Sequence, residues 1–258
     1  MALYGEMLAP EPRVRVPEPV FEFTTKRLLV MTWLEGRPLL SFHAAPQEVR
    51  DDLAVRLFRA WYRPFYEYGV VHGDPHPGNY AVSPEGDLDL LDFGCVRIFP
   101  PEFVEGVVEL YHALRTGDRE RMRRAYRLWG FAELSDELMD ILNEWAAYLY
   151  GPLMDDRPRL IDETGSTRLG RQVVARVHRR LEEVGGVAPP REFVYMDRAA
   201  IGLGAVFLRL RAVVNWHRLF LDLLSLYDPE ALRRRQAAAL ARHGLPPPPP
   251  PGGAGPAG

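Results

Sequence analysis

Three side chains that could hold a divalent cation and accept a proton stand near one another in this sequence. Asp74 and Asn79 lie five positions apart in a stretch rich in proline and glycine, and Asp92 follows a short apolar run. A nucleoside triphosphate is strongly anionic, so a pocket with two carboxylates would repel it unless a divalent cation lay between them. The residue types therefore indicate phosphoryl transfer assisted by Mg²⁺.

The same spacing is typical of protein-kinase sites, where an Asp is followed five positions later by an Asn and then by the Asp of a DFG triplet. We expect Asp74 to accept the proton of an attacking hydroxyl, and Asn79 and Asp92 to be the Mg²⁺ ligands. His72 is expected to brace the loop by packing and hydrogen bonding. For His76, bracing and contact with substrate are equally open.

A long helix and a loop are predicted to lead into this site. The helix should run over 47–68 and stop at Gly69, because glycine readily adopts the backbone conformation that ends helices. The following segment, 73–78, cannot continue as a helix or a central strand and must be a loop. A structural role is assigned to three further residues of the motifs, Gly78, Phe93 and Gly94.

A β-hairpin is predicted immediately after the loop. Short strands over 79–82 and 88–91 flank a turn rich in proline, glycine and acidic residues. A hairpin this short would bring Asn79 and Asp92 to the same end, where a single ion could bridge them.

The remainder of the chain is predicted to be helical, because apolar residues recur at helical spacing. Helices are expected over 103–114, 122–129, 136–149, 167–184, 197–227 and 229–242. Their aromatic stripes could line a lipid pocket, although core packing is the more common role of such stripes. The fold class is therefore α+β and mostly α-helical: a protein-kinase-like C-lobe with a short β-hairpin and a hinge strand, followed by additional helices.

Charge and composition restrict the possible partners. The chain has 258 residues and a formal net charge of -3, which gives no reason to expect a nucleic acid as partner. Arginine clusters over 121–124, 179–180 and 233–235 could touch anionic lipid headgroups. Solvated helix faces are the more common role for clusters within an amphipathic pattern.

Cys95 is the single cysteine, so an intrachain disulfide is excluded and a reducing cytoplasm is expected. We expect a packed, inert thiol, because no flanking feature lowers its pKa. The longest apolar stretch, 199–226, is interrupted by charged residues that are expensive within a bilayer, so it is expected to be a core helix. No secretory signal is expected at Met1.

The motifs resemble those of the ABC1/AarF/UbiB/ADCK family of atypical kinases. The likeness is carried by the block His72 to Asn79, by Gly69-Val70-Val71 before it and by Asp92 to Val96 after it. It is strong over Val14 to Ile98. The resemblance implies binding of ATP and Mg²⁺ and an ATPase activity or a lipid or small-molecule kinase activity. In that family these activities are associated with ubiquinone and other isoprenoid-lipid metabolism. The resemblance therefore adds a quinone precursor and a membrane surface to the possible partners.

The resemblance also implies a domain organisation. The segment Arg27 to Gly36 looks like the family's strand into the hinge, so the backbone of Met31, Thr32, Trp33 and Leu34 would meet the adenine ring. Residues 1–45 are then a remnant of N-lobe strands and hinge, 46–243 a kinase-like helical C-lobe, and 244–258 a disordered tail rich in proline and glycine. A cytoplasmic protein is expected, with peripheral attachment to the inner face of the membrane as an open alternative.

Several features of the family are missing from the sequence. The only lysine of this sequence is Lys26, which lies in a turn ahead of the expected hinge strand. It is expected to be solvated rather than bound to phosphates. We therefore expect a fragment or a mis-started reading frame, which binds nucleotide weakly and is a phosphotransferase or ATPase only once an N-lobe is supplied. Two other functions stay open: a small-molecule phosphotransferase of the aminoglycoside or choline type, and a catalytically inactive pseudokinase scaffold.

Overall fold

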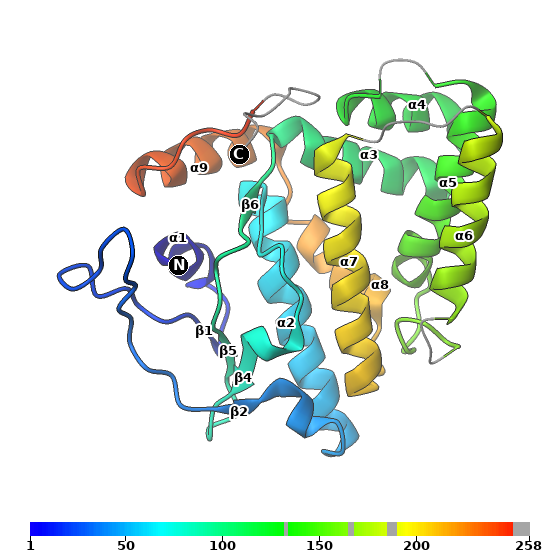
Figure 1. The fold of residues 1–258 in the computed structure, drawn as a ribbon. Coiled ribbons are helices and arrows are strands. Elements are labelled where there is room, and N and C mark those ends of the chain that lie inside the picture. The colour runs from blue at the N-terminus through cyan, green and yellow to red at the C-terminus, as the bar shows by residue number, and fades with distance from the viewer. Residues whose placement is uncertain (132–133, 165–167, 185–189, 250–258) are drawn as a thin grey trace.

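Helices make up most of the fold, and a small sheet lies beside the long helix α2 (Figure 1). The computed structural model describes residues 1–131, 134–164, 168–184 and 190–249. The helices are α1 (Ala2–Leu8), α2 (Gln47–Tyr68), α3 (Pro101–Thr116), α4 (Arg119–Leu128), α5 (Asp136–Tyr150), α6 (Arg168–Glu183), α7 (Arg191–Leu210), α8 (Trp216–Leu224) and α9 (Pro229–Arg242), with short 3-10 turns η1 (Leu39–Phe42), η2 (Pro77–Asn79) and η3 (Gly151–Met154).

The sheet contains the two strands of the predicted hairpin and one further short strand on each side of them. Its order is β1-β5-β4-β2, and a separate pair joins β3 to β6. The strands are β1 (Val14–Arg15), β2 (Arg37–Pro38), β3 (Val70–Val71), β4 (Tyr80–Val82), β5 (Leu88–Leu90) and β6 (Arg97–Ile98). Within the hairpin β4 and β5 are antiparallel, with Tyr80 opposite Leu90. The predicted hairpin is therefore present, with each strand one residue shorter than expected.

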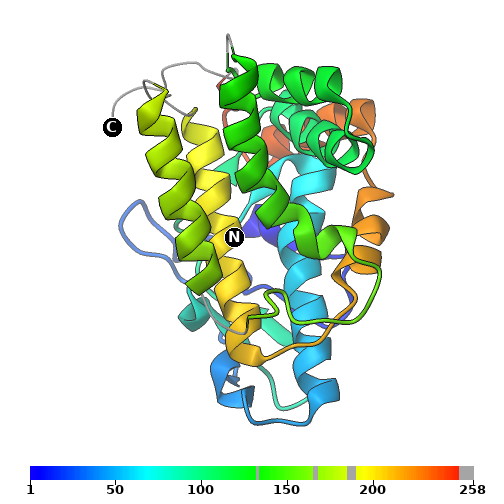
Figure 2. The ribbon, with the colours of Figure 1, turned by 90° about the vertical axis from the view of Figure 1, so that its right-hand side faces the viewer.

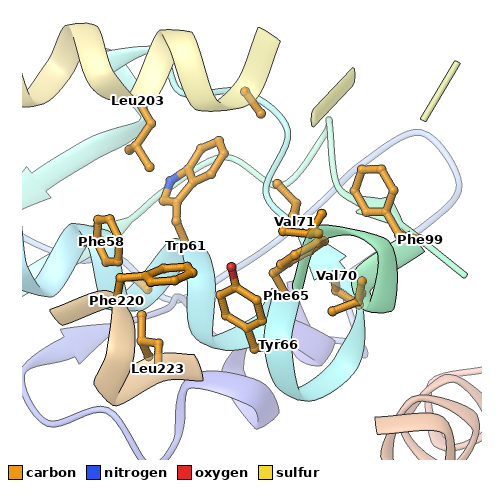
Figure 3. Close-up of a cluster of buried hydrophobic side chains, with 14 of the residues drawn as sticks. Phe58, Trp61, Phe65, Tyr66, Val70, Val71, Phe99, Leu203, Phe220 and Leu223 are labelled. Carbon is orange, nitrogen blue, oxygen red and sulfur yellow. The ribbon is translucent and has the colours of Figure 1, made fainter. Parts of the chain in front are cut away.

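Helix α2 is the element around which the other helices pack. Its predicted bounds are those observed, and Gly69 ends it in the left-handed conformation with a φ of 65°. Its buried side chains, among them Phe58, Trp61 and Phe65, form the centre of the main hydrophobic core (Figure 3). Full burial of such side chains contributes about 1.5–3 kcal/mol each. Helices α3 and α4 lie at its C-terminal end and η1 at the other (Figures 1 and 2).

The segment 197–227 was predicted to be one helix, and that prediction is wrong. Helix α7 ends at Leu210 and α8 begins at Trp216. Between them Arg211 takes a left-handed φ of 53°, and Val214 forms a two-way backbone bridge with Arg159. The Asn215 side chain then caps α8 by accepting a hydrogen bond from the Arg218 amide, as expected of an N-cap asparagine. Among the described residues, every helix is too short or too polar to cross a bilayer.

The strand expected over 27–36 does not form there. This segment makes an isolated bridge between Pro19 and Met31, and backbone hydrogen bonds join Val30 to Val20 and Thr32 to Glu18. The strand that joins the sheet is β2, where Arg37 pairs with Val82 of β4. Most of the preceding segment is exposed, including Trp33 at 89 %. Of the predicted disordered tail, residues 250–258 lie outside the described part of the chain.

The last helix closes the fold against its beginning. The Gln236 amide of α9 donates to the carbonyl oxygens of Tyr68 and Phe99, at 2.7 and 2.8 Å. Glu6 of α1 forms ion pairs with Arg242 and His243 at the end of α9. Helix α9 thereby joins the end of α2 to the segment after β6.

Candidate active site

The loop between β3 and β4 holds Asp74 and Asn79 against each other. The Asn79 side-chain amide donates to Oδ2 of Asp74 at 2.9 Å and to its backbone carbonyl at 3.3 Å. The other carboxylate oxygen, Oδ1, accepts the backbone N–H of His76 at 3.1 Å. Two charge-assisted hydrogen bonds thus orient the Asp74 carboxylate, and this side chain remains partly accessible to solvent.

Asp92 lies just beyond the end of β5, opposite the start of β4. The Leu91 amide donates to the Asn79 carbonyl at 2.9 Å, so the hairpin brings Asn79 and Asp92 to the same end, as the sequence predicted. Oδ1 of Asp92 accepts the Gly94 amide at 2.8 Å, which is the turn geometry typical of aspartate.

Two side-chain oxygens at this end have no hydrogen-bond partner within the described residues: Oδ1 of Asn79 and Oδ2 of Asp92. Amide and carboxylate oxygens are the ligands that Mg²⁺ prefers, and Mg²⁺ commonly takes only one or two protein ligands beside phosphate oxygens. No cluster of three or more His, Cys, Asp or Glu side chains is placed to hold a metal in the ranges that the structure covers. The oxygens of Asn79 and Asp92 are of the kind that suits a magnesium ion bound together with a phosphate.

Close backbone contact joins the loop to the segment after Asp92. Gly73 has a φ of 80°, and a β-carbon on it would lie 2.0 Å from the carbonyl oxygen of Cys95. Only glycine fits here, which explains the glycine between His72 and Asp74. Cys95 itself is exposed, so the prediction of a packed thiol is wrong: the backbone of Cys95 lies against Gly73, while its side chain stays outside.

His72 packs beneath the loop, as its predicted bracing role requires. It is fully buried, its ring lies 5.5 Å from that of Phe93 and 5.8 Å from that of Tyr4, and Nδ1 lies 3.1 Å from the Asp74 carbonyl oxygen. Burial lowers the pKa of His72, while the backbone oxygens of Asp92 and Asp74 act in the opposite direction. Phe93 therefore belongs to the packing around the loop rather than to its surface chemistry.

His76 is exposed, and its ring braces the loop in this structure. Nδ1 of His76 accepts the Gly78 amide at 3.1 Å, and a β-carbon on Gly78 would lie 2.9 Å from that nitrogen. Bracing of the loop, one of the two roles left open by the sequence, is therefore observed, and Gly78 provides the space for it.

A pair of aromatic side chains below Asp74 was missed by the sequence reading. Trp61 of α2 donates to the Tyr80 hydroxyl at 2.8 Å, and that hydroxyl lies 3.4 Å from the Asp74 carbonyl oxygen. Burial raises the pKa of Tyr80, so its phenol remains protonated and can donate. The signal available was the Tyr80 position itself, directly after Asn79 in a predicted strand.

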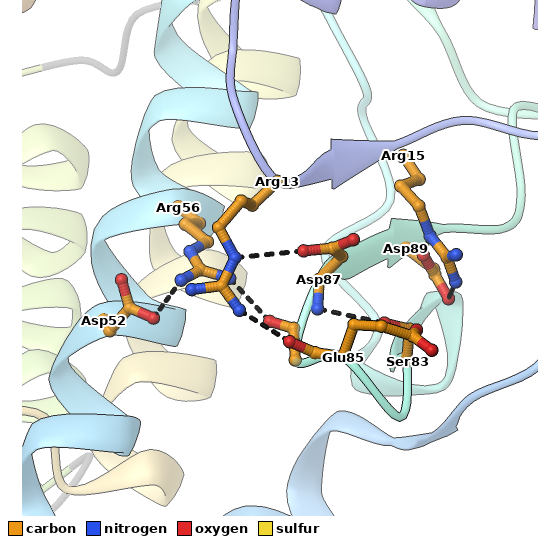
Figure 4. A network of polar contacts seen from close by, with 9 residues as sticks. Arg13, Arg15, Asp52, Arg56, Ser83, Glu85, Asp87 and Asp89 are labelled. Carbon is orange, nitrogen blue, oxygen red and sulfur yellow. Dashed lines mark hydrogen bonds and ion pairs between the residues drawn. The ribbon is translucent and has the colours of Figure 1, made fainter.

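The sequence reading also missed a partly buried ion pair between β1 and β5 (Figure 4). Arg15 of β1 contacts both carboxylate oxygens of Asp89 in β5, at 2.6 and 2.9 Å, and Asp89 is completely buried. This bidentate arrangement is the strong form of the arginine–carboxylate pair. Asp89 is the central residue of β5, so the pair fixes the strand that leads to Asp92.

The predicted hinge residues are not brought to the catalytic loop. Met31 and Trp33 are exposed, and Thr32 hydrogen-bonds with Glu18 through both its amide and its hydroxyl. Lys26 is exposed as well. The four hinge residues therefore remain predictions as nucleotide contacts.

The arginine clusters are engaged in ion pairs between helices. Arg121 of α4 holds both oxygens of Glu109 in α3, at 2.8 and 3.0 Å, and Arg124 pairs with Glu105 at 2.8 Å. Arg235 of α9 lies 3.1 Å from Glu67. These partners already balance much of the positive charge on the described faces.

Comparison with known proteins gives one matching family and several relatives. Residues 1–126 match the family described as the ABC1 atypical kinase-like domain. "Atypical kinase COQ8B, mitochondrial" of Danio rerio is 24% identical over 236 residues, which cover 90% of this chain and 37% of that protein. The protein of that name from Rattus norvegicus is 32% identical over 120 residues, which cover 46% of this chain and 23% of that protein. This chain spans less than two thirds of the length of these relatives.

A solved structure shares the fold. It is described as the complex of Rv3197 with erythromycin from Mycobacterium tuberculosis, and it matches with a TM-score of 0.63 and 18% sequence identity, covering 86% of this chain and 55% of that one. At this identity the likeness concerns the fold alone. The predicted fold class, mostly helical and kinase-like with a small sheet, is confirmed.

Proposed function

We propose a function from the premise that this chain, over residues 1–126, belongs to the ABC1 atypical kinase-like family, as its motifs led us to expect. The proposed function is phosphoryl transfer from ATP, or ATP hydrolysis, at the end of the β4–β5 hairpin. Residues 46–243 form the catalytic lobe, and 1–45 carry the remaining strands and the hinge toward a second lobe.

The observation that carries this proposal is the arrangement of three oxygen-bearing side chains. Asp74 and Asn79 are hydrogen-bonded to each other at 2.9 Å, and the strand pairing sets Asp92 at the same end of the hairpin. Each keeps an exposed or partly exposed surface. This arrangement supports the assignment of Asp74 as the base and of Asn79 and Asp92 as metal ligands of a kinase-type site.

The chain's own residues supply positioning and a base. Asp74 is held by the His76 amide and the Asn79 side chain, which aims its carboxylate to accept the proton of an incoming hydroxyl or water. Asn79 and Asp92 would hold Mg²⁺ through their unpaired oxygens, and the ion would neutralise charge on the transferred phosphoryl group. His72 and Tyr80 maintain the loop from below.

The phosphate acceptor is proposed to be a lipid or a quinone precursor of isoprenoid metabolism. The family assignment supports it, since the resemblance to this family implies isoprenoid-lipid metabolism and a relative is described as a mitochondrial atypical kinase. We further propose that Met31 to Leu34 meet the adenine ring when a complete second lobe is present, and that the protein acts in the cytoplasm at the membrane surface.

A non-catalytic nucleotide-independent role is the second candidate. It is favoured by one observation: the only lysine, Lys26, is exposed and hydrogen-bonds to nothing in the described ranges. Protein kinases use a lysine to pair with the α- and β-phosphates, and its loss would leave a binding scaffold with kinase architecture.

The deciding experiment is thermal unfolding with and without Mg²⁺ and ATP, on this chain and on a chain extended by the upstream lobe of a relative. At a hundredfold excess of ligand over Kd, stabilisation of about 2.7 kcal/mol is expected by mass action. Asp92→Asn should abolish the shift, whereas Glu85→Gln, an exposed side chain in the turn of the same hairpin, should leave it intact.

The outcomes separate the candidates. A shift that needs Mg²⁺ and Asp92 supports the catalytic proposal, and release of phosphate from ATP would then distinguish hydrolysis from transfer. Absence of any shift in the extended chain would contradict nucleotide binding and leave the scaffold role.

A further inference from the structure

A large cavity lies among the helices, apart from the hairpin that carries Asp74 and Asp92. Its volume is about 450 Å³, within the range of small-molecule sites. Side chains of α2, α3, α5, α7 and α8 line it, with contributions from α4, α6 and η3. The lining is mostly apolar and aromatic, so the few polar groups in it determine what kind of molecule it would take.

The first polar group is Asp197 of α7. Its Oδ2 accepts a hydrogen bond from Trp145 Nε1 of α5 at 2.7 Å, and both residues line the cavity. Burial raises the pKa of Asp197 to about 7, and the Trp145 hydrogen bond only partly offsets that effect. The charged form of a buried carboxyl group is stabilised by a cation or a strong hydrogen-bond donor that approaches from the cavity side.

The second polar group is Asp162, on the loop after η3. It is only 9% exposed, and its Oδ1 accepts the amide and hydroxyl of Thr164 at 2.9 and 2.7 Å. Its Oδ2 is buried and has no hydrogen-bond partner within the described residues. A buried carboxylate oxygen without a donor costs free energy, so a donor arriving in the cavity would be stabilised there.

The charge of the cavity wall is one-sided. Asp162 and Asp197 are acidic, and the lining residues that the structure describes include no lysine or arginine. Among these described residues His178 is the one basic side chain, and it is largely exposed and paired with Glu182 at 3.2 Å. Aromatic rings, including those of Trp129 and Tyr148, complete the wall. Carboxylates beside aromatic faces favour an organic cation, which both groups attract.

We propose that this cavity binds an apolar molecule bearing a protonated amine, with the amine hydrogen-bonded to Asp197, Asp162 adding negative charge to the lining, and the apolar body held among the aromatic rings. The cavity is separate from the proposed nucleotide site, so amine binding can be tested independently of the proposed phosphotransferase activity.

Gly204 of α7 gives a handle on the cavity itself. It lines the cavity, and a β-carbon built on it meets no atom within 4 Å. Leucine at this position should fill cavity space without a clash, and it should also favour the helix, because glycine is a poor helix former. Gly5 of α1 has equally open surroundings and lies outside the cavity lining, so Gly5→Leu is the matched control.

The test uses monodansylcadaverine, an aromatic fluorophore with a primary amine on an alkyl chain, and its N-acetylated derivative, which lacks the charge. Trp129 and Trp145 line the cavity, so binding is followed by energy transfer from tryptophan to the dansyl group. Because hydrogen bonds to charged groups contribute about 1.5–3 kcal/mol, the amine should bind at least about tenfold more tightly than the acetylated probe.

Variants define the site. Asp197→Asn keeps an acceptor for Trp145 and should remove most of the tenfold preference, and Asp162→Asn should weaken binding of the amine in the same direction. Asp222→Asn, an exposed carboxylate on α8, should change nothing. Gly204→Leu should abolish binding of both probes, and Gly5→Leu should not.

The proposal is overturned if both probes bind equally, if neither binds, or if neither acidic variant lowers the affinity for the amine. Circular dichroism of each variant identifies a folding failure, in which case the remaining acidic variant decides. Binding that survives Gly204→Leu would place the probe elsewhere and would equally overturn the proposal.

Discussion

Gly202 of α7 lies against Pro75 of the catalytic loop so closely that a β-carbon on the glycine would be 2.2 Å from the proline Cγ. Pro75 follows Asp74 directly, and its ring cannot rotate away. The position of the candidate base is therefore set partly by a helix that begins more than a hundred residues later in the sequence.

Gly202→Ala should displace the loop. The added methyl must push Pro75 or α7, and overpacking of this kind costs about 1–3 kcal/mol. We expect a lower midpoint in urea and loss of any Mg²⁺–ATP stabilisation.

The control is Gly204→Ala on the same helix, where a β-carbon meets nothing within 4 Å. This change should stabilise the fold by up to about 1 kcal/mol through helix propensity. Equal stabilisation by both substitutions would show that the contact with Pro75 does not constrain the loop.

Asp197 should make stability depend on pH. Its pKa is raised from an ordinary 3.8 to about 7, so between these values the folded protein keeps a proton that the unfolded chain has released. The stability that the protonated Asp197 carboxyl contributes is fully present below the pKa of the unfolded chain. It is lost as pH rises through about 7, and the free energy of unfolding then falls by up to about 4 kcal/mol. Asp197→Asn should therefore be more stable than the parent at pH above 7, and the two should converge toward pH 4.

The measurement is urea denaturation across that range of pH, with Asp222→Asn as the control carboxylate. Parallel stability curves for parent and Asp197→Asn would mean that Asp197 titrates normally in the folded protein.

Arg15→Met should destabilise strongly, because it leaves the fully buried Asp89 without a counter-ion. Removal of one partner of a buried pair costs about 3–5 kcal/mol. The neighbouring pair, Arg13 with Asp87 at 3.0 Å, is half exposed on its arginine side, and Arg13→Met should cost no more than about 1 kcal/mol.

A double substitution, Arg15→Met with Asp89→Leu, tests whether the loss of stability comes from the unpaired Asp89 charge or from lost packing. Replacing both charges with apolar side chains of similar size is often close to neutral, so the double variant should regain most of the stability that Arg15→Met loses. If it is as unstable as the single variant, the loss is due to packing of the arginine stem. Denaturant midpoints of the parent, of Arg15→Met, of Asp89→Leu and of the double variant complete the cycle.

Much of the site could be predicted because its signals are local. The end of α2 at Gly69 and the hairpin from Asn79 to Asp92 follow from glycine, proline and short-range alternation. The pair of Arg15 with Asp89 could not be predicted, because a parallel pairing between strands about seventy positions apart leaves no local trace. The break after Leu210 was missed for a similar reason: Val214 is held by Arg159, a residue on a distant loop.

The cavity among the helices was also beyond the sequence. Aromatic stripes on α5 and α7 have the same spacing whether their side chains interdigitate or stand back from one another. Only the packed arrangement shows that Trp145 and Gly204 face open space. The buried acids within it gave no pattern along the chain that differs from ordinary helix and loop charges.

Gln236 has a consequence for the order in which the protein matures during synthesis. The two carbonyls it binds belong to Tyr68 and Phe99, which flank the strands that enter and leave the catalytic segment. A ribosome exposes those strands long before it exposes Gln236, and until then both carbonyls lack this donor. Nascent chains that end ahead of α9 should therefore remain sensitive to protease near Tyr68, and resistance should appear only when the final helix emerges.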